Sequence, residues 1–145
     1  MQPLPHHYST RVSGKPDQNL DLSLENGLGL VVAPPALFDG PGDQWTPEEL
    51  LTASLASCLV LSFRAICKMS KFEWLDIDVN TVGKLERVEK VTKFTEMVTT
   101  AKLVIPAGGD KEQAEKLLHK AESTCFISNT MNCKIDLVCE ITEAE

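Results

Sequence analysis

The 145-residue chain lacks several features that would assign a function directly. It has no Cys-x-x-Cys motif, no glycine-rich phosphate loop, no internal repeat and no low-complexity segment. These absences argue against a thioredoxin-type site and against phosphate-loop nucleotide binding. Basic residues are also scarce: the net charge is −7, and the only arginines are Arg11, Arg64 and Arg87. This balance argues against nucleic acid or an anionic membrane as a partner.

Signals for metal binding and for secretion are also missing. The three histidines, at positions 6, 7 and 119, do not stand at zinc-ligand spacing from a cysteine pair, so no metal site is expected. No basic stretch followed by an apolar run opens the chain, so we expect no secretory signal and a cytoplasmic location. Five cysteines are an odd number, which disfavours a fully paired disulfide framework. In the cytoplasm, thiols stay reduced unless they are catalytic or redox-sensing.

The length and a hydrophobic content of 43% predict one domain, residues 1–145, with a sizeable core. Alternation and turn signals predict strands at 6–14, 19–24, 28–32, 75–82, 84–91, 92–105 and 132–142. Gly83 is expected to mark a bulge or a turn. Helical spacing predicts a long helix over 47–69 and a second one that starts at an Asp110 cap and continues to Cys125. This order indicates a segregated α+β fold with antiparallel sheets.

The long helix begins with a recognisable cap. Thr46 is the expected N-cap, Pro47 occupies the first helical position, and Glu49 takes the third, the capping-box position. Glu48 is left over. Its carboxylate either favours the positive end of the helix dipole or is free for chemistry.

The rest of this helix is apolar on nearly every side, which predicts burial all round. A membrane span is the competing interpretation, but the stretch from Leu50 to Cys67 is barely long enough and Arg64 and several serines interrupt it. We therefore expect the central helix of a soluble core, covered by a second subunit and not by lipid. Arg64 then needs either a carboxylate partner or a path for its head group to the solvent.

The cysteines divide into two groups. Cys133 and Cys139 share the inward face of the last strand with aliphatic residues, and Cys67 lies about 180° round the helix from Cys58, so all three are expected to be packing residues. Cys58 and Cys125 each lie on the apolar face of a helix, far apart in sequence. Reasoning from the residues leaves packing and redox chemistry equally open for this pair.

Two segments carry a family resemblance. Thr-Pro-Glu-Glu-Leu-Leu-Thr-Ala-Ser-Leu-Ala-Ser-Cys, residues 46–58, and Ala-Glu-Ser-Thr-Cys-Phe-Ile-Ser-Asn-Thr, residues 121–130, resemble the OsmC/Ohr family of osmotically inducible and organic-hydroperoxide-resistance proteins. The resemblance implies an intertwined homodimer that reduces organic hydroperoxides as an antioxidant in stress. It implies a peroxidatic Cys58, a resolving Cys125, a Glu48 carboxylate, a lipoyl-type dithiol reductant and no metal or organic cofactor.

The chain departs from the family pattern at two places. Phe126 stands where the family usually has proline, and the N-terminal arginine that activates the thiolate has no clear counterpart. Lys15, Arg11 and Arg64 are the candidate cations for that role. The expected substrate pocket uses Phe38, Trp45, Leu51 and Leu55. A binding module for a small apolar ligand and a non-catalytic thiol redox sensor are the alternative functions.

Overall fold

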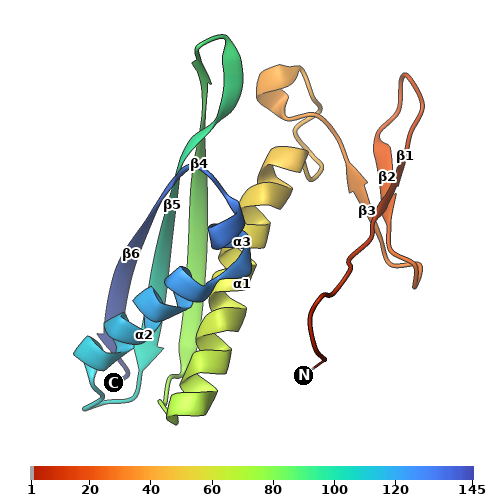
Figure 1. Ribbon diagram of the computed structural model, residues 1–145. Coiled ribbons are helices and arrows are strands. Elements are labelled where there is room, and N and C mark those ends of the chain that lie inside the picture. The colour runs from red at the N-terminus through yellow and green to blue at the C-terminus, as the bar shows by residue number, and fades with distance from the viewer. Residues whose placement is uncertain (1) are drawn as a thin grey trace. The chain divides into compact units, whose positions relative to one another are not determined.

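The computed structural model describes residues 2–145 and divides into two compact units (Figure 1). The first unit ends at Leu50, and the second is Leu51–Glu145. The long helix α1 (Pro47–Ser70) carries the chain from one to the other. A single domain over residues 1–145 stays a prediction, and the two units are described separately below.

The N-terminal unit contains a three-stranded antiparallel sheet. Its strands are β1 (Arg11–Ser13), β2 (Leu20–Ser23) and β3 (Gly29–Val32), in that spatial order. The strand predicted over 6–14 is shorter than expected, whereas the other two agree with their predictions. After β3 the chain forms a single 3-10 turn, η1 (Ala36–Phe38), in a loop that leaves Phe38 exposed.

The C-terminal unit has a second sheet, made of β4 (Asp76–Val88), β5 (Val91–Ile105) and β6 (Lys134–Glu143). β5 is the central strand; it pairs antiparallel with β4 and parallel with β6. The prediction of purely antiparallel sheets is therefore wrong for the β5–β6 pair. The physical reason is the connection, because a helical crossover of more than a dozen residues is what parallel neighbours require.

The separate strand predicted over 84–91 is part of β4. Gly83 does not turn the chain; a Cβ there would lie 2.9 Å from Met97 Sδ and from a Phe94 ring carbon, so glycine lets these side chains pack closely. The expected irregularity follows at once, as a register shift between Lys84 and Leu85. The chain reverses instead at Glu89 and Lys90, with φ of 49° and 70°. Such a two-residue turn normally uses Asn or Gly, so Glu89 and Lys90 carry no recognisable turn signal.

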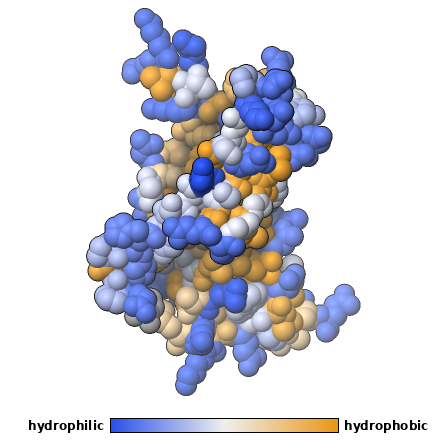
Figure 2. Space-filling view, turned by 90° about the vertical axis from the view of Figure 1, so that its right-hand side faces the viewer, coloured by the Kyte–Doolittle hydropathy of each residue, from blue (hydrophilic) through white to orange (hydrophobic). Residues whose placement is uncertain are grey.

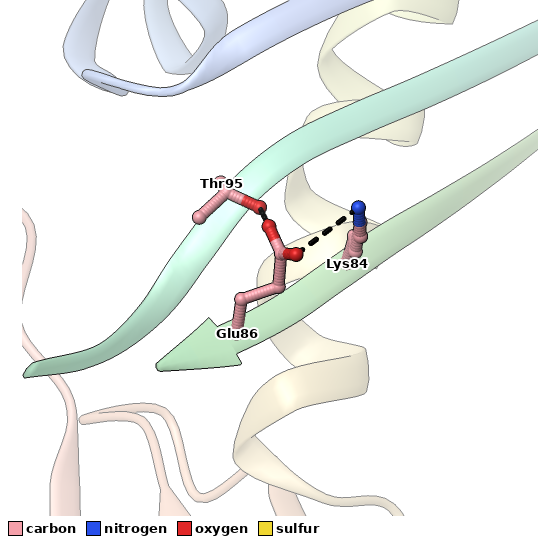
Figure 3. Close-up of polar contacts among 3 residues, drawn as sticks. All are labelled: Lys84, Glu86 and Thr95. Atoms are coloured by element: carbon pink, nitrogen blue, oxygen red, sulfur yellow. Dashed lines mark hydrogen bonds and ion pairs between the residues drawn. The ribbon is translucent and has the colours of Figure 1, made fainter. Parts of the chain in front are cut away.

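Polar contacts join the two strands beside this bulge (Figure 3). The Thr95 hydroxyl on β5 donates a hydrogen bond to the Glu86 carboxylate on β4, and Lys84 Nζ lies 3.1 Å from Glu86 Oε1. The hydrogen bond from Thr95, followed by that from Lys84, lowers the pKa of Glu86. The contacts support the register of the hairpin across its exposed end.

Two further helices follow β5 in the chain: α2 (Lys111–Thr124) and α3 (Phe126–Thr130). The predicted cap of α2 is confirmed, because Asp110 Oδ1 accepts a hydrogen bond from the Gln113 amide at 3.0 Å. The short α3 was not predicted. Together the two helices form the crossover between β5 and β6 (Figure 1).

The main hydrophobic core of this unit lies between the sheet and two helices, and we call it the sheet core. Buried residues alternate along β5, so that Ala101, Leu103 and Ile105 face the same side. α1 and α2 supply the rest of it. Its buried members are Leu59, Phe63, Ile66, Cys67, Ala101, Leu103, Ile105, Ala114, Leu117, Leu118 and Ala121.

Within the described chain only one side of α1 is buried, so the predicted burial all round also requires the second subunit that is expected to cover the helix. Leu55, Leu59 and Phe63 are buried, whereas Leu61 and Met69 are exposed. By length and composition alone, α1 is apolar enough to cross a membrane. Within the described chain, 28% of its most apolar 18-residue stretch is buried. Figure 2 shows hydrophobic residues, in orange, at the surface of the face that it draws. Because α1 contributes residues to the sheet core, it is better described as a central helix whose exposed apolar side is available to a partner.

Candidate functional site

A second, smaller cluster in the C-terminal unit brings together the two cysteines that the motifs single out. We call it the thiol cluster. Its fully buried members are Leu55, Met97 and Cys125. Partly buried residues pack against them: Cys58, Phe94, Ile127, Met131, Cys133 and Ile135. The cluster contains residues from α1, β5, α3 and the segment that enters β6.

Local structure explains how each of the two thiols is positioned. Cys58 lies three residues after the buried Leu55 on α1, so the two side chains share one face of the helix. Cys125 sits between two helices, as the C-cap of α2 and the N-cap of α3. Its Sγ accepts a hydrogen bond from the Ser128 amide at 3.5 Å, the role that a serine or aspartate oxygen plays in an ordinary cap.

The surroundings of Cys58 favour its thiolate. Burial by itself raises the pKa of Cys58, but hydrogen bonds outweigh this effect and the net pKa is lowered. The donors are the Cys125 thiol, the backbone amides of Ile127 and Phe126, and the Ser62 hydroxyl, whose Oγ lies 4.0 Å from Cys58 Sγ. Hydrogen bonds to the charged form are a recognised way to stabilise a thiolate.

The surroundings of Cys125 have the opposite effect. Burial, followed by the hydrogen bond with Cys58, raises the pKa of Cys125 to about 11. The two thiols therefore have different roles. Cys58 accepts hydrogen bonds as the anion, and Cys125 keeps its proton and donates a hydrogen bond to Cys58. This difference depends on the contact between the two thiols, because the hydrogen bond between Cys58 and Cys125 lowers the pKa of one and raises that of the other.

The remaining cysteines lie outside this arrangement or at its edge. Cys67 is buried in the sheet core, and burial raises its pKa to about 11. Cys139 lies at the edge of the same core, where burial and the nearby Glu115 raise its pKa to about 11. Cys133 packs at the edge of the thiol cluster. The prediction that Cys67 is a packing residue agrees with its burial in the sheet core.

Side-chain hydrogen bonds hold α3 against α2. Ser128 Oγ donates to Glu122 Oε1 at 2.8 Å, and Asn129 Nδ2 donates to the Ser123 carbonyl at 3.2 Å. These bonds fix the amides of Phe126 and Ile127 beside Cys58. The sequence did not reveal those two amides as part of the site. A cap-like Cys125 followed three residues later by Ser128 was the signal available, but a cysteine is a rare cap.

The start of α1 carries the predicted carboxylate. Thr46 Oγ1 accepts a hydrogen bond from the Glu49 amide at 3.1 Å, which confirms the N-cap. Glu48 Oε2 is buried and lacks a hydrogen-bond partner among the described residues. A buried carboxylate oxygen without a donor is costly, so this position is open to one.

The three candidate cations are all exposed. Arg64 is on α1, and it is not among the groups that shift the pKa of Cys58. Its exposure agrees with a head group that reaches solvent. Arg11 on β1 and Lys15 just after it belong to the N-terminal unit, so their part in the site stays a prediction.

A cavity of about 330 Å³ opens beside the thiol cluster. Leu51 lines it from α1, seven residues before Cys58 and so on nearly the same face of the helix. The other lining residues are Lys93, Phe94, Met97, Thr130, Met131, Asn132 and Cys133. Of the predicted pocket residues, Leu51 lies in this wall and Leu55 is buried behind it in the thiol cluster.

The other two predicted pocket residues belong to the N-terminal unit. Phe38 and Trp45 are exposed by 59% and 47%. Trp45 lines a shallow hollow of that unit together with Leu22, Leu30 and Val31. Their place in a substrate pocket stays a prediction.

Comparisons with known proteins agree with this arrangement. A family model described as OsmC-like protein matches residues 40–140. The uncharacterized protein YmaD of Bacillus subtilis is 25% identical over 139 residues, which is 93% of each chain. The matched region contains both cysteine motifs.

The fold of nearly the whole chain resembles that of several solved structures. An OsmC-like protein of unknown function from Vibrio cholerae superposes with a TM-score of 0.81 and 24% identity, over 95% of this chain and all of that one. An organic hydroperoxide resistance protein from Elizabethkingia anophelis, with thiocyanate bound, gives 0.78 and 22%, over 99% of this chain and all of that one. These likenesses confirm the predicted α+β fold, which the described chain builds from two sheets and the helices α1, α2 and α3.

Proposed function

The chain belongs to the family of OsmC-like proteins, as its two motifs predict, and we propose that it is a thiol peroxidase that reduces organic hydroperoxides. The observation that carries the proposal is the contact between Cys58 and Cys125, with the pKa of one thiol lowered and that of the other raised. Attack on a peroxide needs a thiolate, and closure of a disulfide needs a second thiol within reach. OsmC-like neighbours named organic hydroperoxide resistance proteins give the substrate class.

The reaction divides into three balanced steps. The Cys58 thiolate attacks the distal oxygen of ROOH, the O–O bond breaks, and the leaving alkoxide takes a proton from solvent as ROH; Cys58 becomes a sulfenic acid. The Cys125 sulfur then displaces the hydroxyl, forming the Cys58–Cys125 disulfide and releasing water. An external dithiol returns both cysteines to thiols and is itself oxidised to a disulfide. The net reaction converts ROOH and a dithiol to ROH, water and a disulfide.

The local donors supply what a nearby cation would otherwise supply. The amides of Phe126 and Ile127 stabilise the Cys58 thiolate, and they carry no net charge. This leaves the candidate cations Lys15, Arg11 and Arg64 a role in orienting the peroxide. The proposed reductant is a lipoyl-type dithiol, the proposed location is the cytoplasm, and no cofactor takes part.

The cavity beside the thiol cluster supports an organic substrate. Its wall includes Leu51, Phe94, Met97 and Met131, and its volume of about 330 Å³ accommodates an alkyl or aryl group. Apolar burial stabilises a bound substituent by about 25 cal/mol per Å². A bulky hydroperoxide therefore gains binding energy that hydrogen peroxide cannot.

We further propose a homodimer that shares each active site between two chains. Glu48 and Cys58 are ten residues apart on one helix, about 15 Å along its axis, so the carboxylate cannot reach the thiol of its own chain. The buried Glu48 oxygen has no donor among the described residues, and α1 leaves Leu61 exposed on an apolar side. A second copy that covers α1 would answer both observations.

One assay tests the peroxidase proposal. Wild-type protein with cumene hydroperoxide and dihydrolipoamide should consume peroxide, and mass spectrometry after one equivalent of peroxide without reductant should show a Cys58–Cys125 disulfide. Cys58→Ser should abolish turnover. Cys125→Ser should accumulate a Cys58 sulfenic acid that dimedone labels. The matched control is Cys67→Ser, which removes a thiol of the same helix that lies in the sheet core and should keep full turnover.

The outcomes separate the alternatives. Sulfenic acid formation without dithiol-supported turnover would assign a thiol redox sensor, and no reaction at Cys58 would leave a binding module for a small apolar ligand. A dominant disulfide through Cys67, Cys133 or Cys139 would overturn the pairing. For the shared site, mixed Glu48→Ala and Cys58→Ser chains should recover activity that each variant lacks alone. Failure of heterodimers to do so would overturn that part only.

A further inference from the structure

Three side chains of metal-ligating types converge where α2 meets β6, outside the thiol cluster. Glu115 and His119 stand four residues apart on α2, one helical turn, and Cys139 faces them from β6. His119 Nε2 lies 3.8 Å from Glu115 Oε1 and 4.0 Å from Cys139 Sγ. One donor atom from each of the three residues lies within 4.8 Å of the others. The peroxidase mechanism uses none of them.

The spacing is close to that of a metal centre. With Zn–N and Zn–O near 2.1 Å and Zn–S near 2.3 Å, neighbouring donors of a tetrahedral zinc site are roughly 3.3–3.6 Å apart. The two distances from His119 Nε2, to Glu115 Oε1 and to Cys139 Sγ, each exceed this range by about half an ångström or less. The Glu115 and His119 side chains are exposed by 58% and 54%, so small rotamer adjustments can close the gap and an ion can enter from solvent.

We propose that Glu115, His119 and Cys139 form a binding site for one Zn²⁺ ion, with water as the fourth ligand. One thiolate, one carboxylate and one neutral imidazole balance the two positive charges of the ion. Three protein ligands and an open fourth position are a common tetrahedral zinc arrangement. Zinc binding releases the Cys139 thiol proton to solvent, so affinity rises with pH.

The proposed site departs from the expectation of no metal centre. That expectation rested on sequence spacing, and Cys139 comes from a different element, twenty residues after His119. A bound ion would connect α2 directly to β6, two elements that already pack together. Since only the folded chain assembles all three donors, zinc should stabilise it.

Cobalt(II) is the probe for the test, because its absorption reports sulfur ligation. The reduced, chelator-treated full-length chain should bind one Co²⁺ with a sulfur-to-cobalt charge-transfer band, and one equivalent of Zn²⁺ should abolish that band. His119→Gln and Cys139→Ser should each weaken Co²⁺ binding at least tenfold. His119 is exposed on a helix surface, so His119→Gln keeps the fold, which circular dichroism can verify.

Matched controls decide between this site and any other thiol. Glu112→Gln removes a carboxylate one turn earlier on α2, Cys133→Ser removes a thiol just before β6, and Cys58→Ser removes the proposed peroxidatic thiol; all three should keep the band. Zinc should raise the melting temperature of the wild type and not of His119→Gln. A band that survives His119→Gln, or one that disappears in Cys58→Ser, would overturn the proposal whatever the peroxidase assay shows.

Discussion

The sheet core and the thiol cluster occupy the same unit, and both bury cysteine, yet they treat it differently. Cys67 belongs to the apolar sheet core, and burial is the cause that raises its pKa to about 11. Cys58 at the edge of the thiol cluster experiences burial too, but donors reverse the shift. Burial therefore makes a thiol inert, and directed hydrogen bonds are what turn a buried position into a reactive one.

The largest expected effect is on stability, from the sheet core. Phe63 is fully buried there, with its ring 5.6 Å from that of Trp74. Phe63→Ala should destabilise the chain by about 3–5 kcal/mol in urea unfolding, because it removes a large side chain and leaves a cavity. Met69→Ala, on the same helix but 75% exposed, should change stability little. Equal effects of the two substitutions would mean that the sheet core does not stabilise the unit.

The next effect is on thiol reactivity. At pH 7 a thiol with a pKa near 11 is ionised in roughly one molecule in ten thousand, whereas one below 9 exceeds about one in a hundred. Iodoacetamide should therefore alkylate Cys58 about a hundredfold or more faster than Cys67 in the folded chain. Peptide mapping by mass spectrometry at timed intervals measures both rates. Similar rates would erase the distinction between the two clusters.

A third effect concerns alkaline stability. The folded pKa of Cys67 is raised from 9.0 to about 11, so the unfolded state loses its proton first. Stability from this thiol is therefore intact below pH 9 and falls between pH 9 and 11, by about 2–3 kcal/mol. Cys67→Ala should lower stability at pH 8 through lost packing but flatten its decline above pH 9. Urea midpoints across that range test this, and parallel declines would contradict the raised pKa.

The smallest effect tests one donor of the thiol cluster. Phe126 occupies the first position of α3, its side chain is 82% exposed, and its amide donates to Cys58. Phe126→Pro restores the usual family residue and removes that N–H while the helix start accommodates the ring. The pKa of Cys58 should rise, and its thiolate at pH 7 should fall roughly two- to tenfold. Phe126→Ala keeps the amide and should leave the alkylation rate unchanged.

The motifs predicted the helix of Cys58 and the helix end of Cys125 correctly because capping and apolar periodicity are local signals. Thr46 and Asp110 both cap as expected. What the sequence could not show depends on backbone geometry and on distant pairing. The amides of Phe126 and Ile127 carry no residue-specific mark, and the turn at Glu89 and Lys90 uses residues that rarely adopt positive φ.

The parallel β5–β6 pair is a different kind of error. The stretch between these strands contains a well-capped helix, and an intervening helix is what a parallel crossover requires. The information was therefore present, and the antiparallel expectation came from treating the sheet as a continuing meander. The Glu115, His119 and Cys139 grouping was hidden for a related reason, since it exists only once β6 returns beside α2.

The double cap at Cys125 would give the proposed redox reaction a conformational readout. As a free thiol, its sulfur accepts the Ser128 amide and closes the first turn of α3. A Cys125 sulfur that forms a disulfide with Cys58 no longer accepts this hydrogen bond. A helix of only five residues is marginally stable, so the loss of its N-cap is not compensated by other turns. Oxidation should therefore loosen α3 and reduction should rewind it. If so, hydrogen exchange at the Ser128 amide should be faster in the oxidised chain, and it would report the redox state of the cysteine pair.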